Sequence, residues 1–371
     1  MMIKIRIHPH YCFLLLSALC ARFELNGASV IRGTVIDRVS REPIHFANVF
    51  LANTTVGTAT TPEGKFELKR ISPGSYHLVI HHIAYEPKII EIDLFTEKQL
   101  SLVVELTPRV ISGEAVEITG KREKSWQKHL KTFQDAFLGH TENAVYCDFL
   151  NPEVLDFSTK KGWLTADSDS MLLLRNQALG YELHFFLREF RCSSDEKKFT
   201  IYPIFKPMQA VQEDDLTRWR KNREKAYRGS FRHLIRSFYL NTLDKEGFDL
   251  YDVKIIGKKV ITWGATDRVK EPEKLIQPSI FPGLKELHLK GHLMVLSHDI
   301  PRMTDLFLGE ARVSNFIQLE FFEPSFVTMT IETALIDALG NVHTPSSFSI
   351  SGYWGSYGVA DLLPFDYHPG D

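Results

Sequence analysis

Apolar and polar residues alternate in short runs along residues 29–120, with turn residues between the runs. The clearest runs cover residues 30–36, 65–68, 76–80, 100–106 and 114–119. Alternation with a period of two predicts β-strands that bury one face. Pro62-Glu63-Gly64 and Ser72-Pro73-Gly74 supply turns, because Pro presets φ and Gly accepts a positive φ. Turns recur about every 8–12 residues with no helical segment between them, so this region predicts a small all-β sandwich.

Helical spacing replaces the alternation at residues 121–141. Four large apolar residues recur every three or four positions: Trp126, Leu130, Phe133 and Phe137. This spacing places them on one face of an amphipathic helix that we expect to end near Gly139. Because a charged segment precedes the helix, we interpret it as a linker helix whose apolar stripe faces a core.

Residues 142–371 predict a larger, strand-rich α+β domain. Strand patterns occur at residues 144–149, 181–187, 199–202, 293–296, 316–322 and 326–331. Residues 213–245 carry a helical pattern instead, and Asp214 and Asp215 suit the positive end of a helix dipole. Gly229 and Ser230 divide this stretch into two helices, with Ser230 as the N-cap of the second. The expected fold class is therefore mainly β, with a front sandwich, a helical linker and an α+β body that contains a helical pair.

The first residues have the order of a secretory signal peptide. Lys4 and Arg6 precede an apolar run at residues 11–21. This run is too short to span ~30 Å of hydrocarbon as a helix, so we expect residues 1–21 to direct export and to be removed. No later stretch reaches about 18 uninterrupted apolar residues, and no transmembrane helix is expected in the mature chain. The expected location is the periplasm or the outer membrane.

The four cysteines raise two separate questions. Cys20 is a candidate for lipid attachment, but Leu19 stands where a small residue is needed, so a lipid anchor is not expected. Cys147 and Cys192 remain after cleavage. An oxidising compartment permits a disulfide between them, and the alternative is two separate buried thiols.

Composition excludes some classes of protein. Of 371 residues, 44% are hydrophobic and 24% are charged, which is ordinary globular usage rather than that of a disordered chain. The formal charge is −2; removal of residues 1–21 deletes Lys4 and Arg6 and no acidic residue, leaving 42 basic against 46 acidic residues, or −4. This balance gives no support for a nucleic-acid partner.

Basic residues nevertheless concentrate in the predicted helical pair. Arg220, Lys221, Arg223 and Lys225 are candidates for binding an anionic envelope component such as a lipid headgroup or a polysaccharide. The alternative is a solvated helix face on which Arg stems cover aromatic side chains.

Signatures of catalysis are missing from the sequence. It contains no G-x-S-x-G elbow, no P-loop and no G-x-G-x-x-G. His288, His292 and His298 form the densest histidine group, and even spacing would put the first two on one face of a strand. We interpret them as ordinary histidines, because a metal site needs convergent ligands. No catalytic residue, cofactor or metal ligand is predicted.

An ordered set of positions in residues 29–120 matches a known family. The positions are Gly33-x-Val35-x-Asp37, Pro43-Ile44, Ala47-Asn48-Val49, Thr60-x-x-x-Gly64-x-Phe66-x-Leu68, Pro73-Gly74-x-Tyr76-x-Leu78 and Ala84-Tyr85. They resemble the carboxypeptidase-like regulatory domain, which has a transthyretin-like β-sandwich. Thr61 and Ala84 depart from the Asp and Gly that are common there. The resemblance implies a fold only, since such domains accompany metallocarboxypeptidases but also precede outer-membrane receptors and unclassified envelope proteins, especially in Bacteroidetes.

Peptidase activity does not follow from this resemblance. A zinc carboxypeptidase needs His and Glu at H-x-x-E spacing, and none of the 15 His residues is followed by Glu three positions later.

Segments of the second part, such as residues 227–233 and 352–355, resemble exported Bacteroidetes proteins that carry the regulatory domain at their front. That resemblance implies no assigned reaction. We therefore expect a non-catalytic cell-envelope protein with a binding, docking or structural role and a protein or glycan partner. The alternative is a hydrolase acting on peptide or polysaccharide, with its site in residues 142–371.

Overall fold

The computed structural model describes residues 29–109, 120–194, 196–256, 259–262, 267–300, 324–344 and 347–370. The expected signal peptide with Cys20, and the strands expected at residues 114–119 and 316–322, lie outside the described residues.

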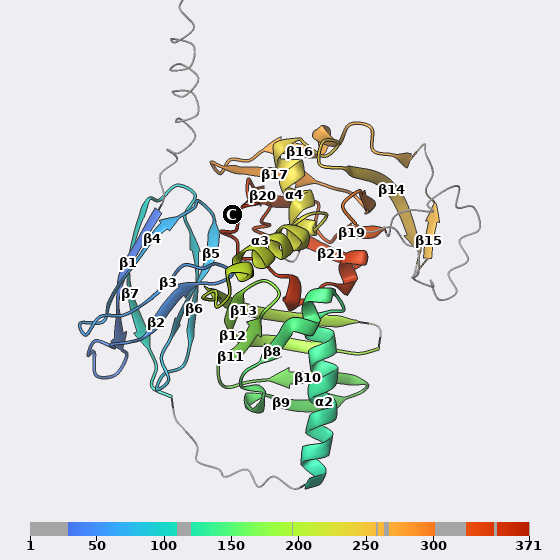
Figure 1. Cartoon of the computed structure of the whole chain (residues 1–371). Coiled ribbons are helices and arrows are strands. Elements are labelled where there is room, and N and C mark those ends of the chain that lie inside the picture. Colours follow the sequence, from blue (N-terminus) through green and yellow to red (C-terminus); the bar gives the residue numbers. More distant parts are fainter. Residues whose placement is uncertain are drawn as a thin grey trace, which may run out of the picture.

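The first part of the chain is a sandwich of two β-sheets (Figure 1). Its described strands are β1 (Ser29–Asp37), β2 (Asn48–Leu51), β3 (Gly57–Ala59), β4 (Lys65–Ile71), β5 (Ser75–His81), β6 (Lys88–Asp93) and β7 (Gln99–Leu106). One sheet has the order β4-β1-β7 and the other β3-β2-β5-β6. Strand β1 is antiparallel to β4 and parallel to β7. The all-β fold expected from the alternation is confirmed.

Alternation puts one face of each strand into a shared core. Ile31, Val35, Val49 and Leu78 are fully buried there, and each such side chain stabilises the fold by about 1.5–3 kcal/mol relative to exposure. Gly64 forms the predicted turn before β4 with φ +70°, and a Cβ at this position would lie 2.5 Å from the Val35 carbonyl oxygen. Glycine is therefore required at this turn by both conformation and space.

A six-stranded sheet and one long helix form the second part. The strands are β8 (Cys147–Phe149), β9 (Asp156–Lys160), β10 (Trp163–Asp167), β11 (Leu172–Asn176), β12 (Tyr181–Cys192) and β13 (Lys197–Pro207). Strand β12 pairs with β13 on one side and with β11 and then β10 on the other. Residues 144–146, expected as strand, instead belong to a 3₁₀ helix, Glu142–Tyr146.

Helix α2 (Gly120–Leu138) lies across one face of this sheet (Figure 1). Leu130, Phe133 and Phe137 of the predicted stripe are buried with Phe185 and Phe190 of the sheet. The expectation that the stripe faces a core is therefore correct. The helix contributes to the core that it shares with this sheet, so it is a structural element of the second part rather than only a linker.

The third part has two further sheets. Strands β14 (Phe248–Ile256), β15 (Lys259–Thr262), β18 (His292–Ser297), β19 (Ser325–Met329) and β21 (Phe348–Gly352) form one, in the order β15-β14-β18-β19-β21. Strands β16 (Ile276–Pro278), β17 (Leu284–His288) and β20 (Thr333–Asp337) form the other. Leu234 and Phe238 of helix α4 (Phe231–Leu240) are buried against both sheets, together with Val295 and Ile336.

The helical pair is confirmed as α3 (Glu213–Tyr227) and α4. At the start of α3, the Asp215 carboxylate accepts hydrogen bonds from the backbone N–H groups of Val211 and Gln212, both at 2.9 Å. Gly229 turns the chain with φ +68°, and Ser230 Oγ accepts from the His233 N–H at 3.1 Å as the expected N-cap. Within the described part of the chain, no helix has the length and apolar character needed to cross a bilayer.

The sandwich is joined to the second part by apolar contact and by backbone pairing. Phe50 and Val79 of the sandwich form a small buried cluster with Phe186 and Ile204 of the six-stranded sheet. The turn after β2 also pairs with the edge strand β13: Asn53 N–H donates to the Pro203 carbonyl at 2.6 Å, and Phe205 N–H donates to that of Thr54 at 2.9 Å. This pairing covers the part of the β13 edge around Ile204 that would otherwise be open to association.

Residues 364–367, which we call the strap, run between the sandwich and the third part. The C-terminal end lies in this position in Figure 1. Phe365 packs against the sandwich core, and its N–H donates to the Asn53 carbonyl at 2.6 Å. Asp366 accepts from the Thr55 N–H at 2.9 Å and from the Thr55 hydroxyl.

Arg232 of α4 holds the strap from the other side. Its guanidinium donates to the carbonyl oxygens of Leu339 (2.9 Å), Pro364 (2.6 Å), Phe365 (2.8 Å) and Tyr367 (3.1 Å). Burial removes water from the Arg232 guanidinium and lowers its pKa. The four carbonyl dipoles take the place of the water that a surface arginine would bind. The sandwich, α4 and the strap are thereby connected at one point.

Cys147 and Cys192 are free thiols. Of the two alternatives left open by the sequence, the structure has the separate thiols. Burial raises the pKa of both, that of Cys147 to about 12. Because the thiolate is the reactive form, the raised pKa values disfavour a nucleophilic role for either cysteine.

Candidate functional site

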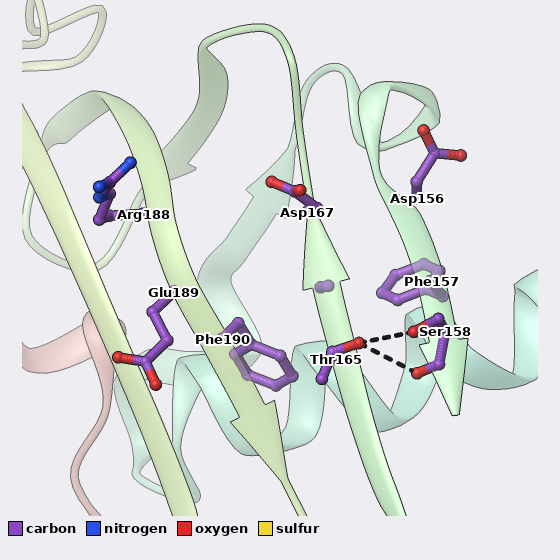
Figure 2. Close-up of a pocket in the computed structure, with 9 residues that line it drawn as sticks. Asp156, Phe157, Ser158, Thr165, Asp167, Arg188, Glu189 and Phe190 are labelled. Atoms are coloured by element: carbon purple, nitrogen blue, oxygen red, sulfur yellow. Dashed lines mark hydrogen bonds between the residues drawn. The ribbon is translucent and has the colours of Figure 1, made fainter. Parts of the chain in front are cut away.

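A shallow hollow of about 410 Å³ lies over β9, β10 and β12 (Figure 2). Its lining consists of Asp156, Phe157, Ser158, Thr165, Ala166, Asp167, Arg188, Glu189 and Phe190. The β9–β10 hairpin closes through Lys161 and Gly162, whose φ angles are 50° and 81°. Two positive φ values give a tight turn that matches the twist of the flanking strands.

Cross-strand register brings polar side chains of this hairpin together. Asp156 lies opposite Asp167, and Ser158 lies opposite Thr165. Because side chains alternate along a strand, these four share one face. The Ser158 and Thr165 hydroxyl oxygens are 2.9 Å apart and hydrogen bonded. Residues directly opposite on a sheet have Cβ atoms about 4.5–5.5 Å apart, so two like charges face each other at one end of the hollow.

Strand β12 adds two charged residues through a β-bulge. The register shifts between Leu187 and Glu189, so Arg188 is an extra residue in the strand. Leu187 and Phe190 both enter the buried core although they lie three positions apart. The extra residue of the bulge lets Leu187 and Phe190 both face the core. It also places Arg188 and Glu189 side by side at the hollow.

The charges of the hollow are only partly neutralised. Glu189 contacts Lys198 at 3.1 Å and Arg191 at 3.9 Å. Asp156, Asp167 and Arg188 are exposed, and no ion pair of Arg188 occurs among the described residues. The hollow thus offers carboxylate acceptors, a guanidinium donor and two hydroxyls to a polar ligand. In the described residues, no group of three or more His, Cys, Asp or Glu side chains is arranged to hold a metal ion.

The four predicted anion-binding residues do not form one group. The Arg223 Nε–H donates to the Leu179 carbonyl at 2.8 Å, and the guanidinium lies 4.0 Å from the centre of the Tyr181 ring. Lys225 forms an ion pair with Glu142 at 2.6 Å. Arg220 and Lys221 are exposed on α3. Arg223 therefore helps to fix α3 to the six-stranded sheet, and anion binding by Arg220, Lys221, Arg223 and Lys225 stays a prediction.

The three clustered histidines have separate environments. His288 ends β17 and His292 begins β18, in different sheets, because Gly291 turns the chain at φ +85°. The expectation that they share one strand face is wrong. The ring nitrogens of His288 contact Glu286 at 3.1 Å and Thr333 at 3.2 Å. His292 contacts Thr328 at 2.7 Å. His298 contacts Asp249 at 3.2 Å.

A second polar cluster surrounds Asp361. Its carboxylate accepts from Thr141 Oγ1 at 2.8 Å and from Asn143 Nδ2 at 2.9 Å. Burial raises the pKa of Asp361 against the opposing effect of these hydrogen bonds, and burial lowers the pKa of Lys197 nearby. Perturbed groups of this kind can mark functional sites. Here they hold the end of α2 against the residues that precede the strap, and we interpret the cluster as structural.

Sequence reasoning missed the hollow, although two signals for it exist. Lys161-Gly162 stands between two alternating runs, a pattern typical of a two-residue hairpin, and that turn alone places Asp156 opposite Asp167. The second signal is the spacing of Leu187 and Phe190 around two charged residues, which breaks strict alternation and indicates a bulge.

Comparison with known proteins identifies the first part of the chain. Residues 31–118 match the family model of the CarboxypepD_reg-like domain. This confirms the resemblance inferred from the sequence for the sandwich, and the match does not extend into the remaining parts. A search of the curated proteins finds no match.

Similar solved structures come from several bacteria. One is a DUF3823 family protein from Parabacteroides merdae, with 10% identity over 48% of this chain and 81% of that chain, and a TM-score of 0.18. Another is a type II cohesin–X-dockerin complex from Acetivibrio cellulolyticus, with 20% identity over 27% of this chain and 73% of that chain, and a TM-score of 0.20. The major pilin subunit of Bacillus cereus has 14% identity over 22% of this chain and 31% of that chain, and a TM-score of 0.19. Likenesses at these TM-scores carry no argument about function.

Proposed function

We propose that this chain is an exported, non-catalytic cell-envelope protein that binds a polar ligand, such as a glycan, in the hollow on its six-stranded sheet. Export rests on the signal-peptide pattern of residues 1–21. The carboxypeptidase-like regulatory sandwich supports a docking or structural role for the first part.

The observation that carries the binding role is the arrangement of exposed charge at the hollow. Asp156 of β9 and Asp167 of β10 lie directly opposite each other on adjacent strands, where like charges are destabilising. A bulge adds Arg188, and a rigid hairpin and the central strand hold all three. Groups that oppose folding locally while remaining open to solvent are expected at binding sites.

Saccharides fit this chemistry. Sugar hydroxyls can donate to Asp156 and Asp167, and the Arg188 guanidinium can donate to ring or hydroxyl oxygens. The Ser158 and Thr165 hydroxyls add groups that can both donate and accept. The hollow is open and shallow, so it suits one segment of a longer glycan better than an enclosed small molecule.

The fixed sandwich supports a scaffold role. Apolar contact, pairing with β13 and the strap all join it to the rest of the molecule. A partner bound to the sandwich would therefore be held at a set position relative to the hollow.

A hydrolase is the second candidate, because paired carboxylates also serve glycoside hydrolysis. Asp156 and Asp167 supply such a pair. In a catalytic pair, one carboxylate is usually buried, and burial raises its pKa so that it stays protonated and acts as the acid. Both carboxylates here are exposed, and this favours binding over catalysis.

One experiment separates the two candidates. The mature chain is screened against envelope glycans, and both retention and released sugar are measured for each. We expect retention without release, with at least a tenfold loss of affinity in the double variant Asp156→Asn/Asp167→Asn and in Arg188→Gln.

Asp214→Asn, which removes an exposed carboxylate on α3, is the matched control and should leave affinity unchanged. Release of sugar that stops in the double variant would replace the binding role with the hydrolase. Equal retention by all variants would remove the hollow from either role.

A further inference from the structure

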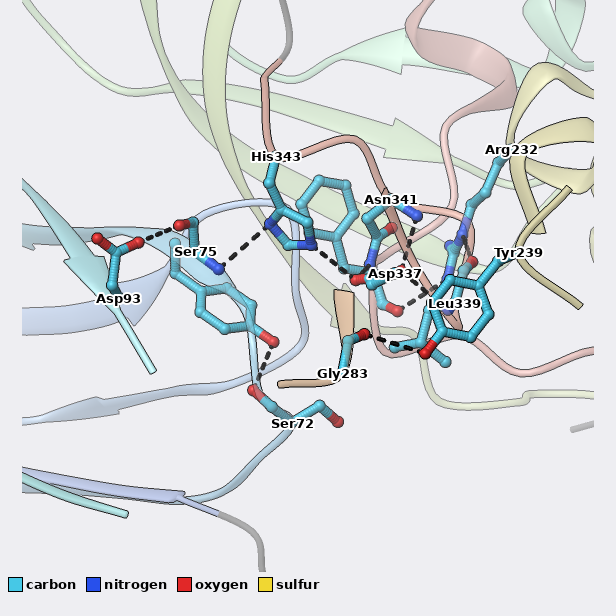
Figure 3. A network of polar contacts seen from close by, with 12 residues as sticks. Ser72, Ser75, Asp93, Arg232, Tyr239, Gly283, Asp337, Leu339, Asn341 and His343 are labelled. Atoms are coloured by element: carbon cyan, nitrogen blue, oxygen red, sulfur yellow. Dashed lines mark hydrogen bonds and ion pairs between the residues drawn. The ribbon is translucent and has the colours of Figure 1, made fainter. Parts of the chain in front are cut away.

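The side chain of His343 bridges the third part and the sandwich (Figure 3). It follows β20 in the chain and is only 4% exposed. The His343 Nε2 atom lies 2.9 Å from Asp337 Oδ2. On the other side of the ring, Nδ1 accepts the backbone N–H of Ser75, the first residue of β5, at 3.2 Å.

These two partners define the protonation of the ring. A backbone N–H can only donate, so Nδ1 must carry a lone pair. The ring proton is then on Nε2, where it is donated to the Asp337 carboxylate. The bridge between sandwich and body therefore requires a neutral His343.

The body side of the bridge is firmly held. Asp337 also accepts hydrogen bonds from the N–H groups of Leu339 and Asn341 and from the Asn341 side chain, at 2.8–3.0 Å. Burial alone would raise the pKa of Asp337, but the hydrogen bond from His343, the charge that this imidazole carries at acid pH, and the hydrogen bonds from Asn341 outweigh it and leave the pKa lowered. Asp337 is thus a fixed anion beside the ring.

The sandwich side is a close surface contact. A Cβ on Gly74 would lie 3.2 Å from His343 Cε1, and the Phe95 ring contacts the imidazole edge-on with centroids 5.4 Å apart. The other charged or titratable groups here are Asp93 on β6, Tyr76 on β5, Arg232 and Tyr239 on α4, and Asp366 in the strap. Carboxylates, tyrosines and arginines do not ordinarily change charge between about pH 5 and pH 8, whereas histidine does.

We propose that His343 is a proton-sensitive latch: it fastens the Ser72–Ser75 edge of the sandwich to the body when neutral and releases that edge when protonated. A proton on Nδ1 removes the acceptor for Ser75 and sets two N–H groups against each other. The same proton leaves the bond to Asp337 intact and strengthens it by charge. Acid therefore loosens the sandwich side and keeps the body side.

The direction of the pH dependence follows from the contacts that differ between the latched and released states. Asp337 contacts His343 in both, so it cancels from the comparison. The Ser75 N–H and the cover by Gly74 and Phe95 exist only in the latched state, and both disfavour a charged ring. A protonated ring is therefore incompatible with the contacts that define the latched state, and latching must weaken as pH falls.

Hydrogen exchange of the full chain tests the latch. Exchange of the peptides spanning residues 72–76 and 340–344 is measured at about pH 8 and pH 5 and corrected for the intrinsic pH dependence. We expect protection of residues 72–76 to fall about fivefold at the lower pH, the factor that one hydrogen bond supports. Protection of residues 340–344 should change much less.

His343→Asn keeps an oxygen acceptor near the position of Nδ1 but takes up no proton, so its protection at residues 72–76 should not depend on pH. His298→Asn, at a histidine with a 57% exposed side chain in the third part, should respond like the wild type. A wild-type profile in His343→Asn, or a wild type without the pH response, would overturn the proposal.

A second pair of variants decides the matter if His343→Asn does not fold. Ser75→Ala keeps the backbone N–H and should retain the pH response. Ser75→Pro removes the N–H at the first residue of a strand, where Pro is tolerated, and should abolish the response. A persisting response in Ser75→Pro would contradict the latch.

Discussion

The junction around Arg232 and His343 and the hollow around Asp156 and Arg188 both gather charged residues, but they use them differently. At the junction, Asp337 is buried with four hydrogen-bond donors, and Arg232 binds four carbonyl oxygens. At the hollow, Asp156 and Asp167 are exposed and face each other. One set of charges is satisfied by the fold, and the other remains available to a ligand.

This difference offers a rule for reading polar clusters in an unfamiliar chain. A buried cluster in which donors and acceptors match contributes to holding elements together, since each unmatched group there would cost about 1–3 kcal/mol. An exposed cluster with unbalanced like charges contributes little to stability and can oppose it. Substitutions at the two places should therefore affect stability with opposite signs.

The largest effect is expected for Arg232→Met. Methionine has a similar length but no donor, so four carbonyl oxygens lose their partner where the strap, α4 and the turn after β20 meet. We expect the free energy of unfolding to fall by about 3 kcal/mol, measured by urea denaturation. Arg218→Met is the control: its side chain is 51% exposed and pairs with Asp215 at 2.6 Å, so its loss should cost no more than about 1 kcal/mol. Equal effects of the two would show that the strap is not held by Arg232.

A smaller, pH-dependent loss is expected for Asp337→Asn. The amide replaces a carboxylate that accepts four hydrogen bonds, and about 2 kcal/mol of stability should be lost at neutral pH. Because the folded-state pKa of Asp337 is lowered, the carboxylate's contribution is present above the pKa of the unfolded chain and is lost as pH falls through the folded-state pKa. The difference between wild type and variant should therefore shrink below about pH 4. A difference that stays constant with pH would assign the loss to packing instead.

The smallest effect, and the one with the opposite sign, is expected for Asp156→Asn. It removes one of two facing carboxylates and should stabilise the chain by about 0.2–1 kcal/mol. Asp167→Asn should give a similar gain, and the double variant should gain less than the sum, since the repulsion can be removed only once. Thermal melts at low and high salt provide the check, because salt screens the repulsion in the wild type. Destabilisation by either single variant would show that these carboxylates serve the fold.

Local patterns explain which features the sequence could reveal. The sandwich strands, the apolar stripe of Leu130, Phe133 and Phe137, and the break at Gly229-Ser230 all depend on residues near each other in the chain. Periodicity and turn chemistry act over the same range, so these expectations were correct. The expected strand at residues 144–149 was only half correct, because Glu142–Tyr146 forms a 3₁₀ helix and only Cys147–Phe149 pairs with β11.

The junction could not be predicted from local sequence patterns. Ser75 and His343 are separated by 268 positions, and Thr55 and Asp366 by 311. Nothing in the neighbourhood of Arg232 distinguishes it from Arg220 in sequence, yet one binds four carbonyls and the other lies exposed on α3. Partner choice over such separations is decided by tertiary packing, on which helical periodicity gives no information.

The contact of Phe365 with the sandwich core has a consequence for assembly. The sandwich strands are synthesised early, but the Phe365 ring that packs against their core and the Asp366 carboxylate that binds Thr55 follow some three hundred residues later. Contacts of such long range are slow to form. These contacts can therefore form only after residues 364–367 have been synthesised and have folded back onto the sandwich, so we expect the sandwich to gain them late in folding.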